Sequence, residues 1–418
     1  MNQKIQLAIV FAAKGIGAAL SVLTVALISR FYGLEVLGLY SLALTIANVG
    51  ALVSSWGLGT SYLMDYQVGP NGDSGRPLAM IVISLLSCLA VFPLMLVVAK
   101  RFNLEEISPV VALFAVLSIF SVKTSFLLAK KKQILNSLLD EIVRPAVPLI
   151  CVIVGYLFLS ATDKENNLSV SLLASYLLLA VAVGLALKFS LLSNAWSISN
   201  SILYVRDRWR FLVKNGAAVT GSLVLVLLVA QVDRFLVRDL AGAEILGLYA
   251  IAQTATNILT YVGQSIILVA TPEIVRCVKL GRFEEIGEIC KKYSLFLLIV
   301  SGGGIFGALL LGKYYFSLFG VKPEFMEQGV LALVILMVGQ GLAAFFGFGI
   351  TVSTYVARRK FLLGSQILAV VVVIVLCVAL VPQWGVVGAA VATSIGSVLV
   401  KALLWYRHRC NGLRVGIV

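Results

Sequence analysis

Long, uninterrupted apolar segments constrain the fold of this chain more than any other feature. One of them surrounds residues Val219 to Gln231, and like the others it continues for about 18 residues or more. In lipid, only α-helices and closed β-barrels satisfy their backbone polar groups. Barrel strands alternate apolar and polar residues over segments of about ten residues. Continuous apolar runs therefore predict membrane-spanning helices.

The composition agrees with a membrane protein. Hydrophobic residues make up 60% of the chain and charged residues 12%, whereas soluble domains contain about a quarter charged residues. The net charge of +14 would suggest a nucleic-acid ligand in a soluble protein. In a membrane protein the side on which the charges lie matters more than their sum, so we expect no nucleic-acid partner.

We predict an all-α polytopic membrane protein with twelve transmembrane helices and short loops. The first apolar run is too long for a signal peptide and lacks a small-residue cleavage site, so it is expected to remain as a helix. The predicted spans are residues 5–29, 37–61, 78–99, 109–129, 142–160, 168–188, 216–237, 245–270, 293–312, 329–353, 362–381 and 386–406.

The basic residues predict the orientation. With the amino terminus inside, 23 of the 33 Lys and Arg residues fall on the inner side, seven fall on the outer side and three lie within spans. Cytoplasmic loops carry the excess of Lys and Arg in membrane proteins. Both termini are therefore expected in the cytoplasm.

A sequence repeat divides the chain into two halves. Residues 34–43 read LEVLGLYSLA and residues 243–252 read AEILGLYAIA, with six identical positions at an offset of 209 in a chain of 418. Six predicted spans separate the copies, so both lie on the outer face and the halves run parallel. Parallel six-helix halves are an architecture of secondary transporters, with the substrate site between the halves.

We accordingly predict three parts. Residues 1–192 form the amino-terminal six-helix half, residues 193–215 a cytosolic connector, and residues 216–418 the carboxy-terminal half. A Gly302-Gly303-Gly304 run lacks the Gly-Lys-Ser/Thr continuation of a phosphate loop. We expect it to serve close helix packing through Gly303 and Gly307 instead.

Ionisable residues inside spans are costly and are functional candidates by default. Lys14 lies nine residues into the first span, about 13 Å deep at 1.5 Å per residue. We expect it to line a hydrated cavity, with a packed or snorkelling lysine as the alternative. Lys123 lies six residues from the inner end of its span, so snorkelling is as good an explanation there.

Asp233 and Arg234 lie near the outer end of the seventh span. Asp233 is the one acid that falls clearly within a predicted span, which makes it a candidate for proton or sodium coupling. An interfacial acid is the alternative, because only about four residues separate it from water. Arg30 and Arg234, each followed by Phe, precede the two copies of the repeat and are interpreted as counterparts.

Lys14, Arg30, Lys123 and Arg234 together predict a cationic cleft with few acids. Such a lining suits an anionic substrate, because Lys and Arg bind phosphates through charge-assisted hydrogen bonds. A pyrophosphate on a lipid carrier would fit. With one His and no Cys-x-x-Cys we predict no metal site, and nothing in the sequence suggests a cofactor or a catalytic residue.

Three patches resemble a known family. They are Ser29-Arg30-Phe31 with Gly38-Leu39-Tyr40-Ser41-Leu42-Ala43, Asp233-Arg234-Phe235 with Gly247-Leu248-Tyr249, and Val381-Pro382-Gln383-Trp384-Gly385-Val386-Val387-Gly388-Ala389-Ala390-Val391-Ala392-Thr393. With twelve spans and both termini inside, the chain resembles the polysaccharide-transport branch of the multidrug/oligosaccharidyl-lipid/polysaccharide (MOP) exporter superfamily, the Wzx-type O-antigen flippases. Its fold should then be similar to that of MATE transporters.

The resemblance implies a flippase in the bacterial inner membrane that serves lipopolysaccharide biosynthesis and polysaccharide export. Its substrate would be an undecaprenyl-pyrophosphate-linked oligosaccharide, moved from the cytoplasmic to the periplasmic face by ion-coupled alternating access. The implied partners are membrane lipids, a proton or sodium ion, a polysaccharide polymerase and a chain-length regulator. Lys14, Arg30, Lys123 and Arg234 would belong to the cationic cavity of such a flippase.

Two alternatives stay open. A drug or small-metabolite antiporter of the same superfamily usually carries an acid in its first helix, where this chain has Lys14. A membrane-embedded polysaccharide polymerase would need a long outer catalytic loop, and the predicted outer loops are all shorter than about twenty residues. The sequence therefore favours a transporter over an enzyme.

Overall fold

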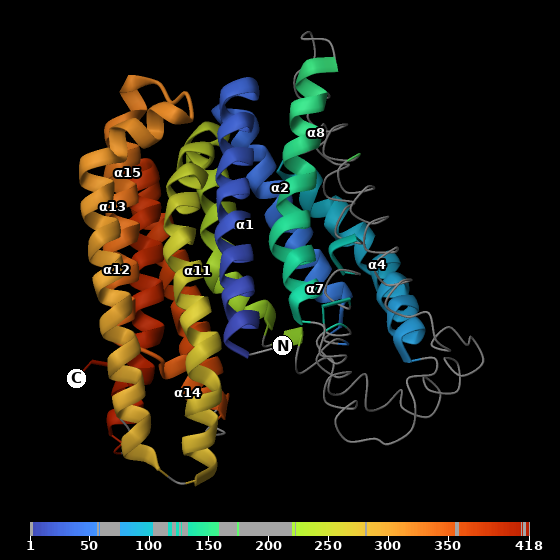
Figure 1. Ribbon diagram of the computed structural model, residues 1–418. Helices are drawn as coiled ribbons and strands as arrows, with labels where there is room; N and C mark the ends of the chain where they lie inside the picture. The colour runs from blue at the N-terminus through green and yellow to red at the C-terminus, as the bar shows by residue number, and fades with distance from the viewer. Residues whose placement is uncertain are drawn as a thin grey trace. The chain divides into compact units, whose positions relative to one another are not determined.

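The computed structural model describes residues 3–56, 58, 76–102, 116–118, 123–124, 127, 133–158, 174, 220–221, 223–280, 282–355, 359–410, 412 and 415–417. Every described element is a helix (Figure 1). The helices are α1 (Gln3–Tyr32), α2 (Leu34–Ser54), α4 (Arg76–Arg101), α7 (Gln133–Ser137), the π-helix η1 (Leu138–Val143), α8 (Arg144–Phe158), a helix through residues 223–241, α11 (Ala243–Leu280), α12 (Phe283–Leu318), α13 (Pro323–Phe345), α14 (Gly349–Tyr355) and α15 (Arg359–Arg409).

The helices confirm a multi-pass membrane protein. In the described part of the chain, seven are long and apolar enough to cross a membrane. The longest, α15, joins two predicted spans at Gly385, whose φ of 52° and ψ of −125° interrupt the helix. The predicted spans 109–129 and 168–188 lie mostly outside the described residues, and the connector 193–215 lies wholly outside them.

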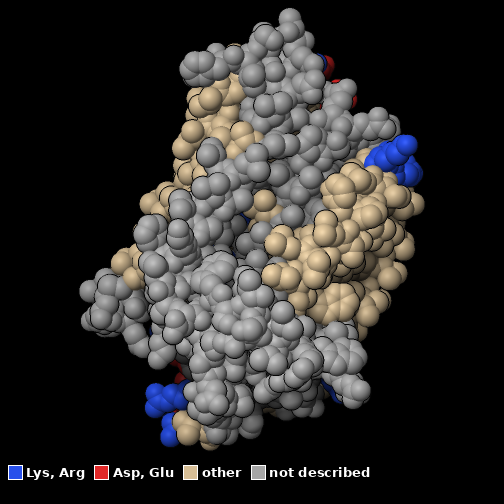
Figure 2. All heavy atoms as spheres, turned by 90° about the vertical axis from the view of Figure 1, so that its right-hand side faces the viewer, with Lys and Arg blue, Asp and Glu red and all other residues tan. Residues whose placement is uncertain are grey.

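The outward-facing surfaces of these helices are apolar, as lipid contact requires. On α4, Leu86, Leu89 and Val97 expose 60%, 72% and 67% of their surface. On the face drawn in Figure 2, the widest described area carries no charged side chain, and Lys and Arg lie at its edge. This pattern agrees with a hydrocarbon surround between two polar boundaries.

The chain forms two compact units. Unit 1 contains residues 1–27 and 39–224, and unit 2 contains residues 28–38 and 225–418. The turn between α1 and α2 thus belongs with the carboxy-terminal helices. There Ser29 donates a hydrogen bond to the backbone carbonyl of Phe319, with an Oγ–O distance of 2.7 Å.

The two copies of the sequence repeat contact each other inside unit 2. A Cβ atom on Gly38 of α2 would lie 2.0 Å from the carbonyl oxygen of Ala243, and a Cβ atom on Gly247 of α11 would lie 2.0 Å from the carbonyl oxygen of Leu34. The fifth residue of each copy therefore meets the first residue of the other. Only glycine allows two helix backbones to approach this closely.

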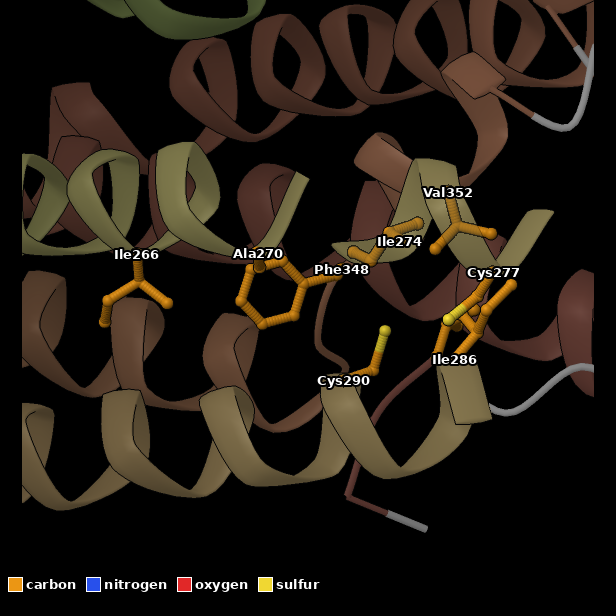
Figure 3. Packing of buried hydrophobic residues seen from close by; sticks show 9 residues of the cluster. Ile266, Ala270, Ile274, Cys277, Ile286, Cys290, Phe348 and Val352 are labelled. Carbon is orange, nitrogen blue, oxygen red and sulfur yellow. The ribbon is translucent and has the colours of Figure 1, made fainter. Parts of the chain in front are cut away.

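A second packing centre lies where α13 gives way to α14. Phe348 is 4% exposed and packs with Ala270 of α11 and Cys290 of α12 (Figure 3). The carbonyl of Val415, near the end of the chain, accepts a hydrogen bond of 2.8 Å from the Phe348 N–H. The Val415 side chain joins the same cluster, so residues 415–417 help to fix the break between these helices.

The glycine-rich stretch of α12 packs differently from the prediction. An added Cβ would meet nothing within 4 Å at Gly303 or Gly307. At Gly304 it would lie 3.3 Å from Leu259 of α11 and from Met337 of α13. The expectation of close packing through Gly303 and Gly307 was therefore wrong, because the helix turns the neighbouring glycine toward the bundle.

The reciprocal crossing of the repeat gives a stability prediction. Gly38→Ala should lower the free energy of unfolding by about 1–3 kcal/mol, because the added methyl group must push two helix backbones apart. Gly247→Ala should behave alike. Since both methyl groups act on one crossing, the double variant should cost less than the sum of the single variants. Thermal unfolding of the purified protein in detergent measures each effect.

The matched control is Gly302→Ala on α12, where an added Cβ meets nothing within 4 Å. It should leave the melting temperature unchanged or raise it slightly, because alanine favours helix over glycine by about 1 kcal/mol. Equal melting temperatures for Gly38→Ala and Gly302→Ala would show that the crossing does not limit stability.

Candidate functional site

A π-helical turn in unit 1 places two acids inside a helix. Pro145 lacks the N–H that would bond the carbonyl of Glu141 four residues earlier, and its ring crowds that carbonyl. The chain widens there into η1, and the N–H of Arg144 bonds the carbonyl of Leu139, five residues back. The freed Glu141 carbonyl faces α1, where a Cβ atom on Gly17 would lie 2.0 Å from it. Such π turns are frequent at functional sites.

The first acid of this turn forms an ion pair. The Lys123 ammonium lies 2.7 Å from Asp140 Oδ1, and Thr124 donates a hydrogen bond of 3.0 Å to Asp140 Oδ2. The Lys123 side chain is 0% exposed, whereas Asp140 is 23% exposed. Lys123 is thus a fully buried cation with an acidic partner, so the snorkelling alternative is wrong.

The second acid interacts with the first helix. The Glu141 carbonyl packs against Gly17 of α1, one helical turn after the half-buried Lys14, whose charge is opposite to that of the Glu141 side chain. Arg144, at the end of the π turn, donates a hydrogen bond of 3.3 Å to the side-chain oxygen of Asn48 on α2. We call Lys14, Lys123, Asp140, Glu141 and Arg144 the π-turn cluster. Its three cations and two acids carry a net charge of +1 when all are ionised.

The sequence prediction missed both acids. It placed a span at residues 142–160, but the helix begins at Gln133 and continues through η1 and α8 to Phe158. Asp140 and Glu141 therefore lie within the helix rather than before it. Asp233 is thus not the one acid within an apolar helix, and the cations Lys14 and Lys123 have the acids Asp140 and Glu141 on the same unit. The cationic lining stays a prediction.

A second polar cluster lies in unit 2 around Asp233, which is 1% exposed. Three side chains donate hydrogen bonds to its Oδ2 atom: the Tyr249 hydroxyl, the Thr393 hydroxyl at 2.8 Å and the Gln253 amide at 3.1 Å. The Tyr249 and Thr393 oxygens also lie 2.8 Å from each other. Asp233 is thus buried between helix 223–241, α11 and α15, so it is not an exposed interfacial acid.

Gln253 connects Asp233 with its neighbour in sequence. Its amide oxygen accepts a hydrogen bond of 2.8 Å from Arg234 Nε, while its amide nitrogen donates to Asp233. The Arg234 N–H donates to Asp233 Oδ1 at 2.8 Å. We call Asp233, Arg234, Tyr249, Gln253 and Thr393 the Asp233 cluster. The amide of Gln253 thus connects Arg234 to the same carboxylate.

The repeat does not pair Arg30 with Arg234. Gly33 and Gly242 both have positive φ, 96° and 92°, and mark the same point before each copy. Counting back from them aligns Arg30 with Asp239. Arg30 is exposed, and its Cγ atom would lie 3.3 Å from a Cβ atom on Gly320.

The same register aligns Asp233 with Thr24. The hydroxyl of Thr24 donates to the carbonyl of Leu20 in its own helix, at 2.9 Å. The Asp233 cluster therefore has no equivalent acid at the matching position of the first half.

The structure unites residues that the sequence singled out separately. Asp233 and Tyr249 come from the two segments of one patch of the family resemblance and Thr393 comes from another patch, yet one set of hydrogen bonds joins all three. Gln253 lay in none of these patches. Its only signal was its position one helical turn after Tyr249, on the same face of α11.

Comparison with family models identifies the chain. Residues 6–278 match the model described as "Polysaccharide biosynthesis protein". The chain belongs to the polysaccharide biosynthesis protein family. A comparison with curated proteins found no match.

Solved transporter structures share the fold of this polysaccharide biosynthesis protein. An inward-facing multidrug resistance MATE transporter of the MOP superfamily matches with a TM-score of 0.73 at 12% identity, covering 96% of this chain and 98% of that chain. A MOP superfamily transporter from Pyrococcus furiosus matches with a TM-score of 0.62 at 12% identity, covering 97% and 94%. A Vibrio cholerae MATE transporter gives 0.62 at 13% identity, covering 97% and 98%. The MATE-like fold is thereby confirmed.

The two clusters give this polysaccharide biosynthesis protein two kinds of polar chemistry. In the π-turn cluster, the side chains of Lys14 and Arg144 are only partly buried, so an anionic ligand could contact their positive charges. The Asp233 cluster surrounds one carboxylate with hydroxyl and amide donors that stabilise its charge. Which of the predicted site residues contact a substrate or an ion stays a prediction.

The ion pair of the π-turn cluster gives an asymmetric stability prediction. Asp140→Asn leaves the fully buried Lys123 without its acid and should cost about 3–5 kcal/mol of unfolding free energy. Lys123→Met should cost less, because the remaining Asp140 is 23% exposed and keeps its hydrogen bond from Thr124. Thermal unfolding in detergent measures the order of the two variants.

The double variant Lys123→Met/Asp140→Leu is the control. Replacing a buried ion pair with apolar residues of similar size is often neutral or stabilising, so this variant should melt near the wild type. A double variant less stable than Asp140→Asn would show that other contacts of these residues, rather than the unpaired charge, dominate.

Proposed function

We propose that the protein is a flippase that moves undecaprenyl-pyrophosphate-linked oligosaccharide, such as an O-antigen repeat unit, across the bacterial inner membrane. The proposal rests on one combination of findings: the chain matches a polysaccharide biosynthesis family, and it has the fold of membrane transporters. A polysaccharide pathway that builds its repeat unit on a lipid inside the cell needs a step that moves this lipid to the outer face.

The charges inside the bundle support an anionic, amphipathic substrate. Lys14 and Arg144 are partly exposed cations on the same unit as the Lys123–Asp140 pair. A pyrophosphate would be bound there by charge-assisted hydrogen bonds, and a scaffold protein would not need charges at this depth. The two termini lie in the cytoplasm in this proposal, and substrate moves by alternating access.

A drug or small-metabolite antiporter is the second candidate. The fold likeness to multidrug transporters favours it, but the first helix carries Lys14 where such transporters usually have an acid. The family match to polysaccharide biosynthesis favours the lipid-linked substrate. A polymerase is less well supported, since the structural relatives are transporters.

A deletion strain tests the proposed function. Lipid-linked single repeat units should accumulate on the cytosolic face of the inner membrane, as measured with sealed inside-out and right-side-out vesicles. Wild-type protein should restore export, Lys14→Ala should abolish it, and Lys14→Arg should retain part of it if charge alone matters. Each variant must be present in the membrane at wild-type amounts.

The matched control is Lys100→Ala, which removes an exposed lysine at the end of α4 and should leave export unchanged. Single repeat units on the outer face would mean that the protein acts after translocation, as a polymerase would. Normal surface polysaccharide in the Lys14→Ala strain would remove Lys14 from the site.

The Asp233 cluster supports ion coupling. Three oxygens, Asp233 Oδ2, Tyr249 Oη and Thr393 Oγ1, lie within hydrogen-bond distance of one another. With Asp233 ionised, the three contacts among these oxygens share two protons, one from the Tyr249 hydroxyl and one from the Thr393 hydroxyl. One added proton would give each of the three oxygen–oxygen contacts its own hydrogen. The cluster can therefore take up a proton and keep all three contacts.

Asp233→Asn should therefore uncouple transport from the ion gradient. In proteoliposomes, an imposed proton or sodium gradient should accelerate translocation by the wild type and leave the variant at its gradient-free rate. Asp239→Asn, an exposed position six residues later on the same helix, makes the same charge change and should respond like the wild type. Gradient-driven transport by Asp233→Asn would exclude this carboxylate as the coupling site.

A further inference from the structure

An apolar slot lies between α13 and the second part of α15 in unit 2, and none of its lining residues belongs to either cluster. Its volume is about 440 Å³. Among the residues that line it are Val334, Val338 and Leu342 on α13 and Ile395 and Val398 on α15. Val338, Leu342 and Ile395 expose 39%, 51% and 43% of their surface, so the slot is open along its side rather than enclosed.

The lining excludes a polar ligand. The one hydroxyl in the wall belongs to Ser394, which donates a hydrogen bond of 3.1 Å to the carbonyl of Ile335. A sugar or phosphate in the slot would find no partner for its own polar groups, at a cost of several kcal/mol for each charged one. The occupant must therefore be hydrocarbon.

The dimensions suit one aliphatic chain. The lining residues run from Val334 to Leu342 on α13 and from Val391 to Ala402 on α15. At 1.5 Å per residue these stretches are about 12 and 16 Å long. One leaflet of a bilayer core is about 15 Å thick, so the slot matches a segment of one chain that lies along the helices within one leaflet.

Aromatic and basic side chains follow the slot toward the end of α15. Phe346 and Trp405 meet there with ring centres 5.7 Å apart. The guanidinium of the exposed Arg409 lies over the Trp405 ring at 5.1 Å. Aromatic residues mark the headgroup level of a membrane, so a chain in the slot would present its polar end near a cation.

We infer that this slot binds the isoprenoid chain of an anionic polyprenyl carrier lipid, with the carrier's phosphate near Arg409. The inference rests on the proposed function, which supplies such a lipid as the transported substrate. A slot for one chain fits a single-chain carrier better than a two-chain phospholipid. The phosphate end and Arg409 have opposite charges.

Occupancy of the slot would also bear on the Asp233 cluster. Ser394 lies in the slot wall, and the preceding residue, Thr393, donates a hydrogen bond to Asp233. Ser394 packs so closely on α13 that a Cβ on Gly339 would lie 2.5 Å from its hydroxyl oxygen. A chain that displaces this turn of α15 therefore changes the contacts of Asp233.

Photolabelling tests the inference with full-length protein in nanodiscs. The probe is undecaprenyl phosphate with a photoreactive group on its chain, and labelled peptides are identified by mass spectrometry. Label should fall on residues 334–342 and 391–402. Val338→Phe, which fills the slot, should weaken labelling roughly tenfold, as loss of about two buried methylene contacts would. Leu331→Phe, on the same helix and 51% exposed but outside the slot, should label like the wild type.

Two competitors identify the source of the chain. Unlabelled undecaprenyl phosphate should compete, whereas phosphatidylglycerol should not, and Arg409→Gln should weaken competition by the phosphate but not by the uncharged polyprenol. Equal competition by phosphatidylglycerol would make the slot a general lipid site and overturn the inference. Label outside residues 334–342 and 391–402 would overturn it as well.

The experiments distinguish a failure of the slot as a binding site from a failure of the proposed flippase function. Slot labelling in a protein that translocates no lipid-linked oligosaccharide would retain the binding site and reject the flippase. Translocation at wild-type rate by Val338→Phe, with its labelling lost, would retain the flippase and reject a role of the slot in transport.

Discussion

The close crossing of the two repeat copies is the contact on which the rest of unit 2 depends. Gly38 and Gly247 each face the first carbonyl of the other copy, and this brings the turn after α1 into contact with the start of α11. Two residues after Gly247, Tyr249 is fully buried and reaches Asp233. Because the crossing fixes the rotation of α11, it also aims Tyr249 and Gln253 at the carboxylate. A wider crossing would move both donors.

Burial of charge explains the local irregularities of unit 1. A buried ion in a membrane protein needs a partner, and a helix normally offers it only at spacings of three or four residues. The π turn at Pro145 places Asp140 against Lys123 and the Glu141 carbonyl against α1, the helix that carries Lys14. A proline that removes a single backbone hydrogen bond thus accompanies the turn that carries both acids.

The sequence predicted the class of fold well and the polar sites only in part. Apolar runs predicted most helices, because hydropathy reports the lipid environment directly. The same criterion placed the start of one span at residue 142, after Asp140 and Glu141, because charges lower the hydropathy of a segment whose partners are not yet known. Asp233 was recognised, but its burial was not, since Tyr249 and Thr393 lie 16 and 160 residues away in sequence. Contacts of this kind depend on packing that no periodicity encodes.

The partners of two buried charges, Lys123 and Asp233, lie in the same unit as the charge itself, and this has a consequence for the proposed transport cycle. Lys123 and Asp140 both belong to unit 1, whereas Asp233 and its three donors all belong to unit 2. Alternating access moves one half against the other as nearly rigid bodies. A buried charge whose partner lay in the other half would lose that partner in one of the two states, at a cost of several kcal/mol. Lys123 and Asp233, whose partners lie inside one unit, avoid that cost in the proposed cycle.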